Sequence, residues 1–523
     1  MKRKWGKKLA GLTLAAALLP LCGGAEANAI DFKIGGQWVM NFDVGQYRLL
    51  KETRNGTTRN KFTDDEFDAK QRIRLSVEAI ASENLSATVQ IQLGATTWGN
   101  ADQGAALGAD GKIVKVRWAY IDWRMPNTDL KTRMGIQYVA MPNKAGGTAI
   151  MGTRIAAILA NYKLNDNLGL TAMWGRPYND NYPGEDKDGV KNYHQNYLDN
   201  LDLFALTVPI TYDGFEATPW AMFGMLGKNT QWNVNAAGDP QLARYSTAGW
   251  TNYTLLPYPG VMARGDYTNS NTSKGYANLF WAGLPLGITA LEPWNFELDL
   301  NYGYVGALGR YNAYKGATRP ENLKRASTER QGWLAKALVE YKFDWGKPGV
   351  FGWYASGDDD NPKNGSERMP SLAAYGNFTS FLGDNPWSLG NWYDQSLDYA
   401  GTWGVGLQLK DVTFFTNDLK HTLRAAYWGG TNSPGMVKYM NNAYAWNDAW
   451  CKWDGPYLTT NDGLLEFNLL SNYKMYENFT VQMEWGYVAN FIDNDTWKKA
   501  GNRNSSFQKQ DSWKGQLKFV YSF

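Results

Sequence analysis

Apolar and polar side chains alternate along most of the chain. Near the start, Phe32 and Ile34 alternate with Asp31 and Lys33. Because successive side chains of a β-strand point to opposite faces, such a segment predicts a strand with one apolar and one polar face. The same pattern returns at 72–79, 85–93, 130–138, 296–304, 333–343, 403–409, 419–427, 465–473, 479–487 and 513–523. It predicts an all-β chain without a helical module.

Short and long connections alternate between these predicted strands. Short turns lie at 82–84, 126–129, 165–167, 212–214, 292–294, 344–347, 416–418 and 477–478. Long polar segments lie at 44–67, 99–112, 140–154, 177–200, 227–274, 307–331, 358–400, 430–463 and 490–511. Eight hairpins plus one strand at each end predict an antiparallel transmembrane β-barrel of about 18 strands, with about 16 as the second choice. So many long loops would be unusual in a soluble domain.

The N-terminal residues 1–29 have the features of a cleavable signal peptide. Lys2, Arg3 and Lys4 open a basic region, and 9–21 is apolar but too short to span a bilayer. Ala27 and Ala29 occupy the small-x-small positions before the expected cleavage, so residues 30–523 form the predicted barrel. A lipoprotein anchor on Cys22 is the weaker alternative, because Leu21 precedes it where a small residue is expected.

The composition is typical of a membrane barrel and argues against a helical membrane protein, a nucleic-acid-binding protein and a disulfide-rich protein. No run of about 18 apolar residues follows the leader, and without helices only a closed barrel can span a bilayer. The leader holds five of the 53 basic and one of the 50 acidic residues, which leaves 48 against 49 and a net charge of −1. The remaining chain therefore offers no basic signature of a nucleic-acid partner. Cys451 alone remains after cleavage, so we expect no disulfide framework.

The last strand carries the strongest local signal. Trp513, Leu517 and Phe519 alternate with polar residues, and the chain ends on Tyr521 and Phe523. Such an ending resembles the C-terminal assembly signal of outer-membrane barrel proteins. With 71–94 and 116–137, it makes the chain resemble the trimeric general porins, in particular the major porins of sulfate-reducing Gram-negative bacteria. The resemblance implies a homotrimer in the cell outer membrane, contact with lipid and lipopolysaccharide, insertion by the barrel-assembly machinery, and passive diffusion of small hydrophilic solutes.

Charged residues on the polar face are the candidate determinants of solute choice. Facing lipid, each Lys or Arg would cost roughly 2–4 kcal/mol near the midplane, so we expect these basic residues in the lumen or at its rim. The resemblance implies that the segment 140–154 folds into the barrel, and this segment has basic residues but no Asp or Glu. The candidate lining residues are Arg72, Arg74, Lys115, Arg117, Lys131, Arg133, Lys144, Arg154, Glu297 and Asp299, with Glu466 and Glu484 further round. We therefore expect a net positive constriction that favours small anions, sulfate among them; the alternative is a solvated face without a role in selectivity.

Aromatic residues are expected to form two girdles on the lipid-facing surface. They make up 15% of the chain, and Trp and Tyr favour the membrane–water interface. The predicted girdle residues are Trp38, Trp118, Tyr120, Tyr138, Trp174, Tyr302, Tyr304, Trp333, Tyr341, Trp403, Tyr427, Tyr473, Trp485, Tyr487, Tyr521 and Phe523.

Two other functions were weighed. An outer-membrane enzyme would need a nucleophile beside a base, but only His194 and His421 exist and neither lies in a recognisable constellation. We therefore expect no catalytic residue. A substrate-selective channel of the maltoporin-like or basic-ladder type stays open as the main alternative. No cofactor is expected, and a metal is only weakly indicated by acidic loops at 185–188 and 358–361 that could bind Ca²⁺ through oxygens.

Overall fold

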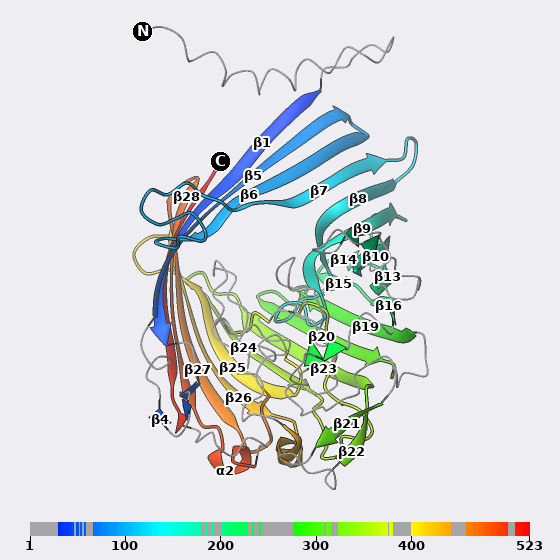
Figure 1. The fold of residues 1–523 in the computed structure, drawn as a ribbon. Helices are drawn as coiled ribbons and strands as arrows, with labels where there is room; N and C mark the ends of the chain where they lie inside the picture. The colour runs from blue at the N-terminus through cyan, green and yellow to red at the C-terminus, as the bar shows by residue number, and fades with distance from the viewer. Residues whose placement is uncertain are drawn as a thin grey trace.

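The computed structural model forms a closed antiparallel β-barrel (Figure 1). It describes residues 30–523 except 47–48, 52, 55–56, 59–65, 179–183, 186–190, 193–200, 228–232, 235–239, 242–275, 308–309, 315–322, 375, 380–398, 441–456 and 500–507. The signal peptide predicted at 1–29 lies outside this part. The wall consists of β1 (Asp31–Gln46), β5 (Glu66–Ser82), β6 (Leu85–Thr97), β7 (Val114–Arg124), β8 (Leu130–Ala140), β9 (Gly152–Lys163), β10 (Gly169–Tyr178), β13 (Leu201–Thr207), β16 (Trp220–Gly227), β19 (Tyr276–Ile288), β20 (Trp294–Val305), β23 (Arg330–Tyr341), β24 (Lys347–Ala355), β25 (Thr402–Val412), β26 (Leu419–Gly430), β27 (Gly463–Tyr476), β28 (Phe479–Asn490) and β30 (Ser512–Ser522).

Pairing closes the ring and confirms the predicted strand number. Each wall strand pairs with its neighbours in chain order, and β1 pairs with both β5 and β30. The sheet contains 20 segments because β14 (Ile210–Tyr212) and β15 (Phe215–Ala217) continue β13 and β16 after short interruptions. Counting each interrupted strand once gives a closed barrel of 18 strands.

The predicted division into short turns and long loops is confirmed along the wall. Only two residues separate β5 from β6, β14 from β15, and β27 from β28. The long connections carry the small elements: β2 (Leu50–Lys51), β3 (Thr53–Arg54), β4 (Thr57–Thr58), β11 (Gly184–Glu185), β12 (Lys191–Asn192), β17 (Asn233–Val234), β18 (Pro240–Gln241), β21 (Arg310–Tyr314), β22 (Leu323–Ser327), the 3-10 helix η5 (Pro434–Tyr439), α2 (Asn494–Trp497) and β29 (Gln508–Lys509). Figure 1 places α2, β21 and β22 at the end of the barrel away from the C-terminus.

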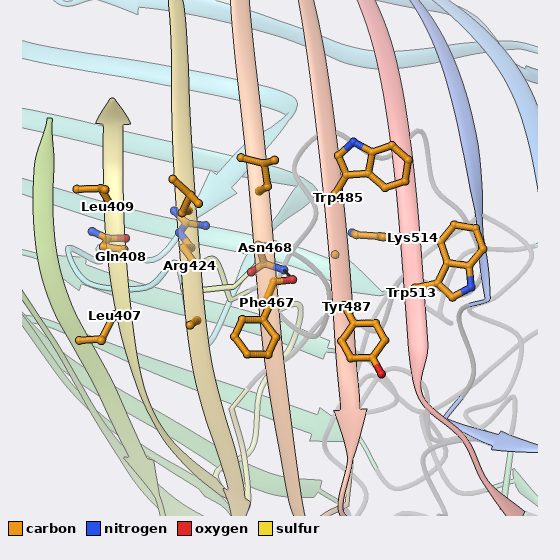
Figure 2. A pocket seen from close by; sticks show the side chains of 14 residues that line it. Leu407, Gln408, Leu409, Arg424, Phe467, Asn468, Trp485, Tyr487, Trp513 and Lys514 are labelled. Carbon is orange, nitrogen blue, oxygen red and sulfur yellow. Dashed lines mark hydrogen bonds between the residues drawn. The ribbon is translucent and has the colours of Figure 1, made fainter. Parts of the chain in front are cut away.

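Alternation sets which side chains face outward. On β1, Phe32 and Ile34 are about two-thirds exposed, whereas Asn41 and Asp43 are buried in the interior. The outward surface is apolar, as contact with lipid hydrocarbon requires. Over β25 to β30 it is hollowed into a groove of about 610 Å³, lined on the outside by apolar side chains such as Leu407, while Arg424 and Lys514 belong to the inward register (Figure 2). Among the described residues, no helix is long and apolar enough to cross a membrane.

Two predicted girdle residues lie on the wrong face. Trp118 pairs with Gln90 and Tyr120 with Thr88, both on the lumen-facing register, and the Arg133 guanidinium stacks 4.1 Å from the centre of the Tyr120 ring. The cause is a bulge between Gln90 and Ile91, which adds a residue to β7. Since one extra residue reverses the faces of everything beyond it, the prediction for Trp118 and Tyr120 is wrong.

The other predicted girdle residues lie on the outward register. Trp38, Trp174, Trp333 and Trp485 are each 40–47% exposed. Tyr304, Tyr341 and Trp403 are paired across the ladder with outward aromatic residues. The outward surface of the barrel therefore carries these aromatic side chains, on the face that the sequence indicated.

The lumen is divided into a packed half and a polar half. From β9 round to β24 the inward side chains are largely apolar and buried, for example Leu203, Met222, Leu279 and Phe351. From β28 through β30 and β1 to β8 they are mostly charged or amide-bearing. Because a packed apolar interior excludes water, the apolar side chains from β9 to β24 leave little room for solvent in that half.

Candidate functional site: the lumen of the barrel

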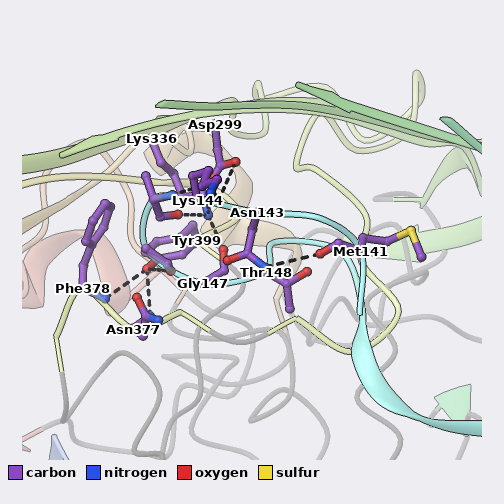
Figure 3. A network of polar contacts seen from close by, with 12 residues as sticks. Met141, Asn143, Lys144, Gly147, Thr148, Asp299, Lys336, Asn377, Phe378 and Tyr399 are labelled. Carbon is purple, nitrogen blue, oxygen red and sulfur yellow. Dashed lines mark hydrogen bonds and ion pairs between the residues drawn. The ribbon is translucent and has the colours of Figure 1, made fainter. Parts of the chain in front are cut away.

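The segment between β8 and β9 crosses the lumen. Ala145, Ile150 and Met151 are almost fully buried, although the segment contains no strand of the wall. Its backbone is bound on the far side, where Asp299 of β20 accepts hydrogen bonds from the Lys144 amide at 3.0 Å and the Ala145 amide at 2.7 Å (Figure 3). The segment 140–154 thus folds into the barrel, as the resemblance implied, and narrows it.

A buried ion pair fixes this segment to the wall. Lys336 of β23 is fully buried, and its Nζ lies 3.5 Å from the Asp299 carboxylate. The same ammonium donates hydrogen bonds to the carbonyl oxygen of Ala145 at 2.6 Å and to that of Gly147. Both charges are therefore compensated, which a buried pair requires if it is not to destabilise the fold. Lys336 was missed in the sequence because nothing in the alternation distinguished it from other polar strand residues.

A second long loop closes over the first. The Tyr399 hydroxyl donates a hydrogen bond to the Gly146 carbonyl at 2.6 Å and accepts one from the Asn377 amide at 3.2 Å. Backbone bonds join Ala373 to Ile150 and Gly152. Phe378 stacks on Phe351 of the wall, with ring centres 4.7 Å apart. The two loops together form the plug of the packed half.

Three of the predicted basic residues lie on the polar half, and a fourth, Arg154, lies beside it on β9. Electrostatic repulsion couples Arg72 and Arg74 of β5 with Arg117 of β7 and Arg154 of β9. Gln92 bridges two of them, since its Oε1 accepts from Arg74 at 3.1 Å and from Arg117 at 2.7 Å. Within the described residues, none of the four forms an ion pair. They form a cationic cluster whose charge is available to a solute.

The remaining predicted basic residues do not join this cluster. Arg133 forms a bidentate ion pair with Asp122, at 2.7 and 2.9 Å. Lys144 pairs through its side chain with Glu216. Lys115 and Lys131 are exposed. The sequence indicated the charges correctly but not the acidic neighbours that neutralise some of them.

The predicted acidic residues occupy separate positions. Glu297 accepts a hydrogen bond from Asn295 at 3.1 Å, and Asp299 is engaged with the loop. Glu484 pairs with Lys514 at 2.8 Å, and Glu466 accepts from Asn468 at 2.8 Å. None of these acids faces the four arginines in an ion pair, so the transverse arrangement of a basic wall opposite an acidic loop is not present in the described part of the lumen.

A charged cavity of about 410 Å³ lies beside the crossing loop. Its walls come from the inward faces of β25, β26 and β27 and from both plug loops. Lys410, Lys420 and Arg424 line it, and none of them is among the lining residues predicted from the sequence. Lys420 and Arg424 sit on the polar register of a predicted strand and Lys410 directly follows one, but many residues that line no cavity do the same.

The residues considered for catalysis or metal binding do not come together in one place within the described part of the chain. His421 lies on the outward register, as predicted, and its Nδ1 lies 2.8 Å from Ser471 Oγ. His194, Cys451 and 186–188 fall outside the described residues. Asp358 is bound by Ser366 at 2.6 Å and Tyr457 at 2.8 Å, which leaves its oxygens engaged. In the described ranges, no group of three metal-binding side chains comes together.

The outer loops hold two carboxyl groups with shifted acidity. Burial raises the pKa of Asp358, although Arg368 nearby opposes the shift. Burial, reinforced by the carboxylate of Asp358, raises the pKa of Glu367 to about 7. The charge of this loop therefore changes near neutral pH.

Comparison with known proteins yields similar structures only. Neither the models of protein families nor the curated proteins match the sequence. Solved OccK/Opd porins of Pseudomonas aeruginosa are similar to this chain. OccK11 (OpdR) has a TM-score of 0.46 and 11% identity, covering 94% of this chain and 95% of that one. OccK2 (OpdF), solved in complex with glucuronate, has a TM-score of 0.46, 10% identity and coverage of 94% and 98%. OpdK, solved with vanillate, has a TM-score of 0.45, 8% identity and coverage of 94% and 98%.

The chain is an integral β-barrel of the outer-membrane type. Its closed ring, apolar outward surface, short turns and long loops establish this architecture. The finer resemblance, to trimeric general porins and to those of sulfate-reducing bacteria, remains a prediction.

Proposed function

We propose that the chain is an outer-membrane porin through which small hydrophilic solutes diffuse passively, with a preference for anions. The polar half of the lumen supplies the aqueous route, and the crossing loop narrows it. The proposal includes a homotrimer in contact with lipid and lipopolysaccharide, inserted by the barrel-assembly machinery. It involves no catalytic step and no cofactor.

The cluster of Arg72, Arg74, Arg117 and Arg154 carries the proposal. Four guanidinium groups without carboxylate partners among the described residues make one wall of the route positive. A narrow passage lined by one sign of charge, with low-dielectric walls, concentrates ions of the opposite sign. Arginine also presents a planar fork of donors that suits oxyanions. Small anions, sulfate included, are therefore the preferred solutes.

The test is the reversal potential of the purified full-length chain in a planar bilayer under a salt gradient. The wild type should favour chloride over potassium, and Arg72→Gln with Arg74→Gln should move the reversal potential towards zero. Lys115→Gln with Lys131→Gln removes the same charge from exposed positions and should leave it nearly unchanged. A cation preference in the wild type contradicts the proposal.

A solute-selective channel is the second candidate. It is favoured by one observation: the two plug loops leave a lined cavity instead of an open bore. Current that saturates with one solute supports this candidate, whereas permeation that depends only on solute size supports a general porin.

A further inference from the structure

The cavity beside the crossing loop has the character of a second solute site, separate from the arginine cluster. Three neighbouring strands build it with their inward faces. Arg424 pairs across the ladder with Gln408, Thr422 with Leu470, and Lys420 with Asn472. Lys410 adds a fourth level on β25. One continuous patch of the wall therefore supplies most of the lining.

Three cations in this cavity lack a carboxylate partner. Within the described residues, Lys410, Lys420 and Arg424 form no ion pair, and the Nε of Arg424 is buried without a hydrogen-bond partner. Buried donors are normally bonded, so an unsatisfied guanidinium nitrogen beside a cavity indicates a place for an acceptor.

The acidic groups around the cavity are mostly occupied. Asp411 is paired with Lys347 at 2.8 Å. Lys144, the fourth basic lining residue, pairs with Glu216. Among the described residues, Glu297, which accepts a hydrogen bond from Asn295 at 3.1 Å, is the lining acid without a cation within ion-pair distance. The lining residues without ion pairs are thus three cations and one acid.

Three further carboxylates act on Arg424 from outside the cavity. Glu340 accepts a hydrogen bond from Gln408 at 2.6 Å, Glu466 from Asn468 at 2.8 Å, and Glu484 pairs with Lys514 at 2.8 Å. None of them belongs to the lining. Their negative charges act on Arg424, and each carboxylate also has another polar partner.

The positions of the cations indicate the kind of solute. Lys420 and Arg424 lie four residues apart on one strand, about 13 Å between their Cα atoms. Lys410 and Lys420 both act on Asp411, so they lie together at the end of the cavity near the short turns. Between the two ends, Leu338, Phe378 and Leu470 offer apolar contact, and Thr422 and Asn472 offer hydrogen bonds.

We infer that this cavity is a subsite for a small dicarboxylate, with one carboxylate bound by Arg424 and the other by Lys410 and Lys420. Its volume of about 410 Å³ lies in the usual range of small-molecule pockets, about 300–1,000 Å³. The inference rests on the proposed function, because the solute must reach the cavity through the lumen. It adds a solute class and a second binding position to that function.

Block of chloride current by succinate tests the inference, measured on single channels of the full-length protein. Succinate should reduce the current saturably, whereas succinamide, its neutral counterpart, should not. Lys410→Gln with Lys420→Gln should weaken the block roughly tenfold, as expected for losing a charge-assisted contact. Both lysines lie outside the packed core, so the barrel should still fold. Lys115→Gln with Lys131→Gln is the matched control and should leave the block unchanged.

The outcomes separate this inference from the proposed function. Anion selectivity without saturable succinate block overturns the dicarboxylate site and leaves the porin in place. Block that survives Lys410→Gln with Lys420→Gln but disappears in Arg72→Gln with Arg74→Gln also overturns it, since the arginine cluster would then be the only site. Equal block by succinamide shows steric obstruction and overturns it as well. A channel that prefers cations contradicts the proposed function itself.

Discussion

At the scale of single residues, the neighbours of a charged side chain decide whether its charge is available to a solute. Arg117 and Arg133 sit on adjacent strands, yet one remains available and the other is neutralised by Asp122. The sequence placed both on the polar face, because alternation alone determines the face. It could not pair Arg133 with Asp122, since that contact depends on the register between two strands. For the same reason, the sequence did not indicate that Lys410, Lys420 and Arg424 line one cavity.

The ion pair between Asp299 and Lys336 should set the width of the route. Asp299→Asn leaves Lys336 buried without its counter-charge, a change that typically costs about 3–5 kcal/mol. It also weakens the hold on the amides of Lys144 and Ala145. We expect larger and noisier single-channel currents.

The control for this prediction is Asp495→Asn, which breaks an exposed pair with Lys498 in α2. That variant should conduct like the wild type. A steady current of normal size in Asp299→Asn would show that the crossing loop is held without the ion pair.

The raised pKa of Glu367 predicts a pH-dependent outer loop. The folded carboxyl binds its proton more tightly than the unfolded one, because its pKa of about 7 exceeds the ordinary 4.5. Stability from this group is therefore complete below about pH 4.5, declines as the pH rises towards 7, and is lost above it. Hydrogen exchange, corrected for intrinsic rates, should show better protection of 358–374 at about pH 5 than at about pH 9. Glu367→Gln should remove the difference, while a difference that persists in this variant assigns it to another group.

At the scale of elements, the sequence predicted the positions of the strands better than the surroundings of each strand face. Seven of the eight predicted short turns contain Gly, Asn or Asp, and the eighth, at 292–294, contains Pro293. These turns were predictable because turn chemistry is local. The strands of the packed half, such as β13 and β16, are apolar on both faces, for example Leu203 beside Phe204. That pattern follows from the plug loops that cover them, and a loop folding back across a lumen leaves no periodic signal.

Gly135 of β8 lies opposite Tyr120, just past the bulge at 116–118 of β7. Gly135 has φ of +133°, and a Cβ there would lie 2.2 Å from the Ala119 carbonyl oxygen. Gly135→Ala should therefore strain the β7–β8 pairing, at a cost of about 1–3 kcal/mol for the backbone conformation alone. The midpoint of urea unfolding in detergent or lipid should fall.

Gly99→Ala serves as the comparison for Gly135→Ala. Gly99 also has a positive φ, +83°, but no atom lies within 4 Å of the added Cβ. It should lower the midpoint less. Equal effects of the two substitutions would mean that close packing against Ala119 contributes nothing.

At the scale of the whole molecule, the sequence predicted that the strands close into a ring, but it did not predict how the interior of the ring is filled. The number of hairpins and the final aromatic strand were enough to predict a closed ring of about 18 strands. The division into a packed half and a polar half required contacts between residues far apart in the chain, such as Tyr399 with Gly146. Function depends on the second property, which is why solute choice was less predictable than the fold.

Closure itself depends on the last residue of the chain. The Phe523 amide donates to the Gly36 carbonyl at 3.1 Å, and the Phe523 carbonyl accepts from the Gly36 amide at 2.8 Å, so these bonds extend the seam between β30 and β1. The Phe523 ring lies over Gly36, where an added Cβ would come within 2.5 Å of it, and stacks with Tyr521 at 5.9 Å. Deleting Phe523 removes both backbone bonds and the ring that covers the seam. We expect a clear drop in the fraction of protein that migrates as the folded, heat-modifiable form on gels. Phe415→Ala, at a 93% exposed aromatic in a turn far from the seam, should leave that fraction unchanged. If the truncated chain assembled as efficiently as the wild type, the seam would have to close through the remaining pairs from Gln37–Ser522 to Gln46–Trp513 alone.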